Sequence, residues 1–467
     1  MSSGLAPLPA EAAPRREAEE LAAVVTQVDA ARVRYSPWPV LATLAALVVL
    51  DLPGLGSDGW AFHPGLVEPR GPFSALVRAS GGQWELGMLR APALFAGLIV
   101  ALFAVRAWRA STWRPRTTIA LAAVVLTLLI APAVLLQAGL RESTAPWFFT
   151  NDSTYQIELA GGLVAHGDNP YGHDYAGSGL ERFYQLDGAA PRSQHSALQH
   201  FAYFPGTPLT AAAWRALPAP FDDYRFFVLL ATLGLFFAAL VFDAPFGWRL
   251  AAGAALAANP LILQGAWFGV ADAPSLFFLV LAFALLTRSR YLLAAASLAA
   301  AVLLKQFALV ALPFFIVMLL AREVRRATLR GSALVFATVL MAGFLPFLIA
   351  GPHALWDDTV GYGAGTYAIR GYGLAPLLIR AGLVDGHASA YPFALLVLLV
   401  WLPATAWLLR NQIQSRALWV GAGGFAVSIF LLLFIARVFH PSYLVWPLTG
   451  VALAALLAAT PRSQAAG

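Results

Sequence analysis

The feature that most restricts the possible folds is a succession of about twelve long apolar runs, nearly all separated by short connections. A helix needs about 20 apolar residues to cross the hydrocarbon layer of a membrane, and shorter helices are tolerated. We therefore predict an all-α fold, a polytopic transmembrane bundle of about 12 spans, several of them broken or tilted. The predicted spans are residues 37–54, 92–107, 117–139, 225–243, 248–262, 271–287, 291–304, 307–321, 331–350, 391–409, 417–437 and 442–459.

Composition supports a membrane protein and excludes several kinds of site. The 467 residues are 60% hydrophobic and 12% charged, whereas a soluble domain carries about 25% charged residues. There is no cysteine, which excludes disulfides, zinc–thiolate sites, iron–sulfur clusters and a cysteine nucleophile. The acidic residues are scattered and no nucleotide-binding motif is present, so we expect neither a metal nor a cofactor.

The arginines predict the orientation in the membrane. They gather in short loops at 106–116, 288–290, 322–330 and 410–416, which lie on one side if every span crosses. The positive-inside rule makes that side cytoplasmic, together with both termini, and this distribution does not indicate a nucleic-acid partner. The long connections 55–91, 140–224 and 351–390 then reach the external face of the plasma (inner) membrane, and all eight histidines fall on or near that face.

Four parts follow from this topology. Residues 1–36 form a polar cytoplasmic segment, in which 17–29 are either a surface helix or disordered. Residues 37–116 form an N-terminal transmembrane hairpin with an external loop. Residues 117–459 form the core, with amphipathic helices in its external loops, and 460–467 a cytoplasmic tail. The apolar stretch 201–219 contains two prolines and an arginine, which favours a helix on the membrane surface over a crossing.

The first candidate for chemistry is Asp152, just after the third span. Ser153 followed by Gln156 is a capping-box pattern, which predicts a helix from Thr154 to Gly167. If Ser153 caps the helix, Asp152 remains available beside a helix N-terminus at the membrane boundary. The alternative is that Asp152 itself is the cap.

Asp272 and Lys305 are the next candidates. Asp272 falls in the first turn of a predicted span, where it either belongs to a site or complements the helix dipole. Lys305 is the only lysine and interrupts a long apolar run. With Gln306 it forms either the external tip of two short helices or a point near mid-membrane. A cation that binds a lipid phosphate or a carboxylate explains this position better than a snorkelling side chain.

Two external segments combine aromatic and charged residues. Arg437, His440 and Tyr443 lie together before the last span, and the 351–390 loop contains aromatic and acidic residues and Arg370. This combination suits a carbohydrate or a phosphorylated headgroup, and it suits an ordinary interfacial loop nearly as well.

Four stretches, in this order, carry a resemblance to a known family. They are Asp152 followed by Asn169-Pro170-Tyr171; Tyr203-Phe204-Pro205-Gly206-Thr207-Pro208-Leu209; Asn259-Pro260 with Asp272, Lys305 and Pro313; and His440-Pro441-Ser442-Tyr443. Together they resemble the GT-C glycosyltransferases, in particular the GT87-type mannosyltransferases that use polyprenyl-phosphate mannose. The resemblance covers roughly residues 117–459.

The resemblance implies a mechanism and a set of partners. It implies that Asp152 is the general base on an acceptor hydroxyl and that a hexose, mannose first, is transferred with inversion from a polyprenyl-phosphate donor to an envelope lipid or glycan. The leaving phosphate needs positive charge or hydrogen-bond donors, and Lys305, Arg370 and His440 are the candidates in falling order. Asp272 would contact the sugar or the acceptor. The other predicted substrate-binding residues are Gln306, Tyr443, Tyr171 and Tyr203.

Two other classes of protein remain open. A transporter or lipid flippase would have paired ionisable groups along a central path and repeated spans, and no repeat is evident. A non-catalytic scaffold of an envelope-polysaccharide assembly would need none of these residues for chemistry.

Overall fold

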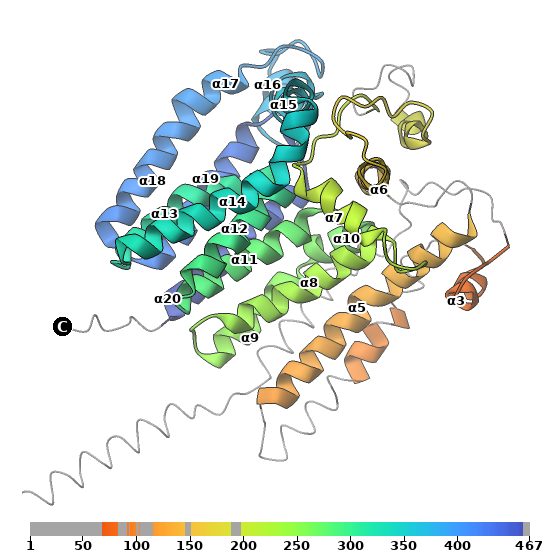
Figure 1. Ribbon diagram of the computed structural model, residues 1–467, viewed down its shortest axis with the longest axis horizontal. Coiled ribbons are helices and arrows are strands. Elements are labelled where there is room, and N and C mark those ends of the chain that lie inside the picture. Colours follow the sequence, from red (N-terminus) through yellow and green to blue (C-terminus); the bar gives the residue numbers. More distant parts are fainter. Residues whose placement is uncertain are drawn as a thin grey trace, which may run out of the picture.

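The computed structural model describes residues 68–82, 115–144, 151–187 and 198–460, together with 91–92, 94–99 and 102 (Figure 1). The predicted N-terminal segment, the first predicted span, half of the second, His195 and residues 461–467 of the C-terminal tail lie outside the described residues. The domain boundaries at 36 and 460 therefore remain predictions.

The described chain is all-α, and its only strands are two residues long. The elements before the main bundle are α3 (Ser74–Ala79), α5 (Pro115–Ser143), α6 (Asp152–Ala165), the 3₁₀ helix η2 (Leu180–Asp187) and α7 (Gly206–Trp214). The bundle continues with α8 (Tyr224–Val241), α9 (Phe246–Ala258), α10 (Pro260–Phe268), α11 (Asp272–Thr287), α12 (Tyr291–Leu304), η5 (Gln306–Ala311), α13 (Leu312–Ala321) and α14 (Arg326–Ala350). The remaining elements are α15 (Pro352–Trp356), η6 (Asp357–Thr366), β1 (Arg370–Gly371), α16 (Leu374–Arg380), α17 (Phe393–Leu396), η7 (Val397–Trp401), α18 (Leu402–Ser415), α19 (Leu418–Ile435), β2 (Val438–Phe439), η8 (Pro441–Leu444) and α20 (Val445–Ala459).

The apolar helices make the chain a multi-pass membrane protein. Six helical segments in the described part are long and apolar enough to cross a membrane: Pro115–Ser143, Tyr224–Val241, Arg326–Ala350, Phe393–Ser415, Leu418–Ile435 and Pro441–Ala459. Three more, Asp272–Thr287, Tyr291–Leu304 and Gln306–Ala321, are apolar but shorter. Each coincides with a predicted span, so the all-α membrane fold is confirmed, while the count of about 12 remains a prediction.

One predicted span, 248–262, is formed by two helices and not by one continuous helix. The chain breaks at Asn259, and α9 and α10 meet there at 48°. Pro260 cannot donate a backbone hydrogen bond, and the Asn259 side chain accepts from Leu261 N at 2.9 Å instead. The pair is therefore a bent span or a re-entrant segment.

The centre of the bundle is formed by α8, α11, α12, α19 and α20, whose inward side chains are fully buried, as for Leu276, Leu279 and Phe283. The outer helices α14 and α18 carry large apolar residues that no protein group covers. Leu334 in α14 is 68% exposed, and Leu399, in the turn before α18, is 62% exposed. Lipid is the natural solvent for such surfaces.

The predicted surface helix at 201–219 is α7, which has nine residues. At 1.5 Å per residue it is about 14 Å long, too short to cross the hydrocarbon layer. Gly206 opens it, and a Cβ there would lie 2.7 Å from the Leu303 carbonyl. Only glycine therefore permits this close approach of α7 to the end of α12.

The two long loops of the core are joined to each other. Asp358, buried at the start of η6, accepts hydrogen bonds from Gly172 N at 2.9 Å and from Phe201 N at 3.2 Å. His200 Nδ1 lies 2.8 Å from the same carboxylate. These contacts fasten the 351–390 loop to the 140–224 loop.

A short parallel strand pair fixes the same loop to the end of α19. Arg370 pairs with Val438, and Gly371 pairs with Phe439. Arg437 donates from Nε to the Tyr367 carbonyl at 2.6 Å and from Nη2 to the Ser389 carbonyl at 3.1 Å. The 351–390 loop is thereby held beside the segment that leads into α20.

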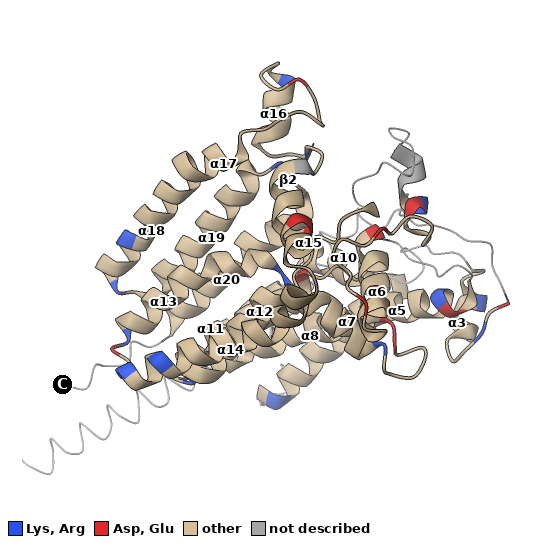
Figure 2. Cartoon of the chain, turned by 45° about the horizontal axis from the view of Figure 1, so that its top comes forward, with Lys and Arg blue, Asp and Glu red and all other residues tan. Residues whose placement is uncertain are grey.

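Charged residues mark the ends of the bundle. Figure 2 shows Lys and Arg at the ends of α13, α14 and α18, away from the acids that directly follow α15 and from those near α6. Arg322 follows α13, Arg326 begins α14, and Arg416 follows α18. The arginines of the 322–330 and 410–416 loops thus lie at one end, and that this end is cytoplasmic remains a prediction.

Candidate functional site

The site is built around a break in the helical chain at Lys305. This residue is extended, with φ −154° and ψ 128°, between α12 and η5. The Leu304 carbonyl accepts from Thr207 Oγ1 at 2.6 Å, and Gln306 Nε2 donates to the Ala202 carbonyl at 3.1 Å. Of the two sequence interpretations, Lys305 therefore matches the tip between two short helices, although it is buried.

Lys305 forms an ion pair with Asp272. Lys305 Nζ lies 2.7 Å from Asp272 Oδ1, and the two side chains are only 7% and 8% exposed. Trp446 Nε1 donates to the same oxygen at 2.6 Å. Asp272 is therefore occupied as the partner of a cation and an indole, which makes it unsuited to accept a proton from substrate.

Aromatic rings surround the ammonium of Lys305. Lys305 Nζ lies 5.3 Å from the ring centre of Phe307, 5.6 Å from that of Tyr443 and 5.8 Å from that of Tyr203. These are cation–π distances. Phe307 also packs edge-on against Tyr443 and Trp446, at 5.4 and 5.6 Å between ring centres. The cluster keeps water away from the ion pair and leaves aromatic surface around it.

Asp152 is the first residue of α6, and the capping-box prediction for it is wrong. Asn151 caps the helix by accepting from Ser153 N at 3.0 Å and Thr154 N at 3.4 Å. Gln156 does not turn back to the cap, because its Nε2 donates to the His200 carbonyl at 2.9 Å. Asp152 is therefore not the cap and is half-buried at a helix N-terminus.

Tyr203 connects Asp152 with the ion pair. Burial raises the pKa of the Tyr203 phenol, a hydrogen bond with the Ser153 side chain lowers it, and the charges of Asp272 and Asp152 raise it. Both acids therefore act on one phenol. The hydrogen bond from Ser153 places the first turn of α6 at this phenol, and Lys305, the partner of Asp272, lies 5.8 Å from its ring centre.

His440 and Tyr367 both interact electrostatically with Asp152 and Arg370. Burial and the charge of Arg370 lower the pKa of His440, while Asp152 raises it. Burial and Asp152 raise the pKa of Tyr367, and Arg370 lowers it. Arg370 is in β1 and His440 follows β2, so the strand pair brings them together. His440 also contacts Tyr443 edge-on, at 5.7 Å between ring centres.

Most of the residues predicted for the site therefore lie in one region. Seven are joined by the contacts and electrostatic interactions above: Asp152, Asp272, Lys305, Tyr203, Tyr443, Arg370 and His440. Gln306 borders the site and bonds to Ala202. Tyr171 lies apart from the ion pair, buried against Phe201 and Phe347, and its hydroxyl donates to the Tyr203 carbonyl at 2.8 Å.

Trp446 was missed from the sequence. In the sequence, Trp446 resembles an ordinary interfacial aromatic residue at the start of a span. Only the structure shows its hydrogen bond to Asp272. The available signal was its position, six residues after His440 in the last motif. Among the described residues, no group of three or more His, Asp or Glu side chains is arranged to hold a metal ion.

Comparisons with known proteins give one likeness in three dimensions. No protein-family profile and no curated protein matches the chain. The crystal structure of ArnT from Cupriavidus metallidurans bound to undecaprenyl phosphate is similar over 66% of this chain, at 19% sequence identity and a TM-score of 0.41. The match covers 55% of ArnT, so the chain spans about half the length of that protein.

Proposed function

We propose that the protein is an integral-membrane glycosyltransferase of the GT-C type that uses a polyprenyl-phosphate sugar. The observation that carries the proposal is that α6 and α11 meet at Tyr203, and that the acids which begin these helices have different surroundings. Asp272 is paired with Lys305 at 2.7 Å, whereas Asp152 is half-buried beside a histidine and an arginine. The surroundings of Asp152 suit a general base. Those of Asp272 suit a fixed part of a binding site.

Asp152 is the proposed general base. Its carboxylate takes the proton of the acceptor hydroxyl while that oxygen attacks the anomeric carbon of the donor sugar. The bond from the anomeric carbon to the phosphate oxygen breaks, and the polyprenyl phosphate leaves with the electron pair. Attack from the face opposite the phosphate inverts the anomeric configuration.

The basic groups of the site are the proposed partners of the leaving phosphate. Charge grows on the phosphate as the glycosidic bond breaks, and fixed cations in a water-poor site stabilise it. Lys305, Arg370 and His440 are the candidates. Lys305 keeps its position through Asp272, and Arg370 keeps its position through the strand pair.

The aromatic rings suit the rest of the donor. Tyr203 and Tyr443 flank Lys305, and aromatic faces beside a cation accommodate the apolar face of a sugar. We propose a hexose, with mannose as the first to test, and an envelope lipid or glycan as acceptor. The site then lies on the external face of the plasma membrane, opposite the arginine-rich end.

Transfer from a labelled donor tests the proposal. Membranes that contain the protein are incubated with radiolabelled polyprenyl-phosphate mannose, and label in lipid and glycan fractions is followed. The proposal predicts labelled product that is lost in the Asp152→Asn variant. Donor that crosses the membrane unchanged, with no product from mannose or other hexose donors, would instead indicate a transporter.

A further inference from the structure

The two acids begin α6 and α11, and one contact joins the first turn of α6 to the end of α10, the helix directly before α11. Thr154, two residues after Asp152, donates from Oγ1 to the Phe268 carbonyl at 2.6 Å. Phe268 is the last residue of α10, four residues before Asp272. The carbonyl at a helix end has no hydrogen-bond partner within the helix. The Thr154 hydroxyl of α6 is its partner here.

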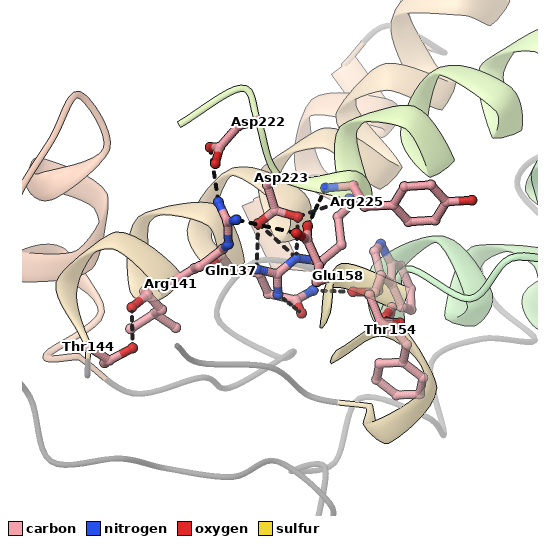
Figure 3. A network of polar contacts seen from close by, with 12 residues as sticks. Gln137, Arg141, Thr144, Thr154, Glu158, Asp222, Asp223 and Arg225 are labelled. Atoms are coloured by element: carbon pink, nitrogen blue, oxygen red, sulfur yellow. Dashed lines mark hydrogen bonds and ion pairs between the residues drawn. The ribbon is translucent and has the colours of Figure 1, made fainter. Parts of the chain in front are cut away.

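The turn between α10 and α11 rests on a buried arginine. Arg225 is fully buried, and its Nε donates to Asp223 Oδ1 at 2.9 Å (Figure 3). Arg225 Nη1 donates to Gln137 Oε1 at 2.9 Å, and Gln137 Nε2 donates to the Trp267 carbonyl. Gln137 thus connects Arg225 to the last turn of α10 through two hydrogen bonds.

Gly269 shows how closely the turn between α10 and α11 packs against Arg225 and Thr154. Its φ is +73°, and a Cβ there would lie 2.5 Å from Arg225 Cγ and 2.9 Å from Thr154 Cγ2. The backbone of the turn therefore lies directly against both side chains. Movement of either one would move the segment that leads to Asp272.

The middle of α6 is anchored separately through Glu158. Its Oε1 accepts from Tyr224 N at 2.7 Å, and its Oε2 accepts from Arg215 Nη1 at 3.0 Å. Arg141 Nη2 lies 3.4 Å from the same Oε2. Figure 3 shows this group beside Arg225. Glu158 thus holds the middle of α6, while Thr154 ties its first turn to the end of α10.

We propose that the hydrogen bond from Thr154 to the Phe268 carbonyl, seated on Arg225 and Gln137, sets the separation of Asp152 and Asp272. Thr154 is thus a positioning residue. Its importance for catalysis rests on the proposed function, whereas its effect on the separation of the two helices does not. Rates respond steeply to such spacing, because a displacement of about 1 Å can cost about 100-fold.

A distance measurement tests the geometric part without any substrate. The chain has no cysteine, so spin labels on His166→Cys, directly after α6, and Gln264→Cys in α10, both exposed positions, report one distance in the full-length protein. We expect Thr154→Val to shift the distance distribution or to make it wider than in the protein with Thr154. We expect Thr154→Ser to restore the original distribution. An unchanged distribution in Thr154→Val would overturn the proposal.

Thr232→Val is the matched control. Thr232 is also fully buried, but its hydroxyl bonds only to the Val228 carbonyl of its own helix, at 2.8 Å. We expect it to leave the distance unchanged, and a shift equal to that of Thr154→Val would overturn the proposal. Should Thr154→Val not fold, Thr154→Ala removes the same hydroxyl without adding a methyl group.

Kinetics separate this proposal from the proposed function. We expect Thr154→Val to lower kcat between about 10- and 100-fold, with the donor KM changed by no more than about two-fold. Thr154→Ser should retain the rate. A protein that transfers no sugar while its label distance responds to Thr154 would refute the enzyme and leave the positioning intact. An active enzyme whose kcat is unchanged in Thr154→Val would refute the positioning alone.

Discussion

Lys305 Nζ lies 2.7 Å from Asp272 Oδ1, although 33 residues separate the two in the chain. Both side chains are almost completely buried. Burial of a single charge is costly, and a buried pair is tolerated because each charge compensates the other. The pair is therefore both a structural element and the fixed centre of the proposed site.

Removal of one member of this pair should destabilise the protein strongly. We expect Asp272→Asn to lower the free energy of unfolding by about 3–5 kcal/mol, because Lys305 is left buried without its counter-charge. The double variant Asp272→Asn/Lys305→Met should recover part of that loss. Thermal unfolding in detergent measures both.

An exposed ion pair provides the control for that prediction. Asp243 and Arg288 lie 3.0 Å apart, with side chains 51% and 42% exposed. Asp243→Asn should cost less than about 1 kcal/mol, because solvent screens such a pair. Equal losses for Asp243→Asn and Asp272→Asn would contradict the assignment of Lys305–Asp272 as a buried, mutually dependent pair.

The indole of Trp446 should matter through its hydrogen bond to Asp272. Trp446→Phe keeps an aromatic ring beside Phe307 but loses a donor to a charged acceptor, which is worth about 1.5–3 kcal/mol. We expect lower stability and a rise in the donor KM, measured by initial rates at varied donor concentration. Trp401→Phe loses the bond from the indole to the Ser428 carbonyl, 3.0 Å long, and should leave the donor KM unchanged. The same KM in both variants would argue against a role for Trp446 in the site.

Arg437 should control the order of the 351–390 loop. It donates to the carbonyls of Tyr367 and Ser389, and Arg437→Gln cannot span both. We expect faster amide exchange over residues 367–389 and lower activity, followed by hydrogen–deuterium exchange and transfer rate. Arg380→Gln, an exposed substitution in the same loop, should change neither. Unaltered exchange in Arg437→Gln would show that the strand pair alone holds the loop.

The stability of the protein should fall in mild acid partly because of His440. Its pKa is held below the ordinary value of 6.5 by burial and by Arg370. The unfolded chain therefore binds a proton more readily than the folded chain, and His440 costs stability as the pH falls below about 6.5. His440→Gln should flatten the decline of the melting temperature between about pH 7 and pH 5. The exposed His166→Gln is the control, and parallel declines in all three proteins would contradict this role.

Helix positions were predictable because lipid imposes a length and a polarity on each span. The apolar runs that become α8, α11, α12 and α14 could therefore be located to within a few residues. Lys305 stood out for a similar reason, since a lone lysine in an apolar run needs a partner. Its partner could not be predicted, because the number of residues between two positions does not give the distance between the helices that carry them.

The cap of α6 shows a different limit. Asn151, Asp152 and Ser153 follow one another, and each is a good N-cap residue. Sequence preference cannot choose among them, and the choice depends on how α6 packs in the fold, chiefly against α7. Thr154, which settles the contact with α10, looks like an ordinary polar residue of the first turn.

The buried charges were also beyond sequence reasoning. Arg225 and Asp358 are usually surface types, and nothing in their neighbourhood marks them as buried. Arg225 is buried because Asp223, two residues before it, and Gln137 of α5 both bond to it. Asp358 is buried because two loops close over it. Such environments arise only from the tertiary fold.

The most direct test of the central claim is the transfer rate of Asp152 variants with a polyprenyl-phosphate sugar. General-base catalysis contributes about 10²- to 10⁴-fold, so kcat should fall by that factor in Asp152→Asn, with an unchanged melting temperature. Asp168→Asn, at the exposed other end of α6, should keep the full rate. A folded Asp152→Asn enzyme with near-normal turnover would contradict the account.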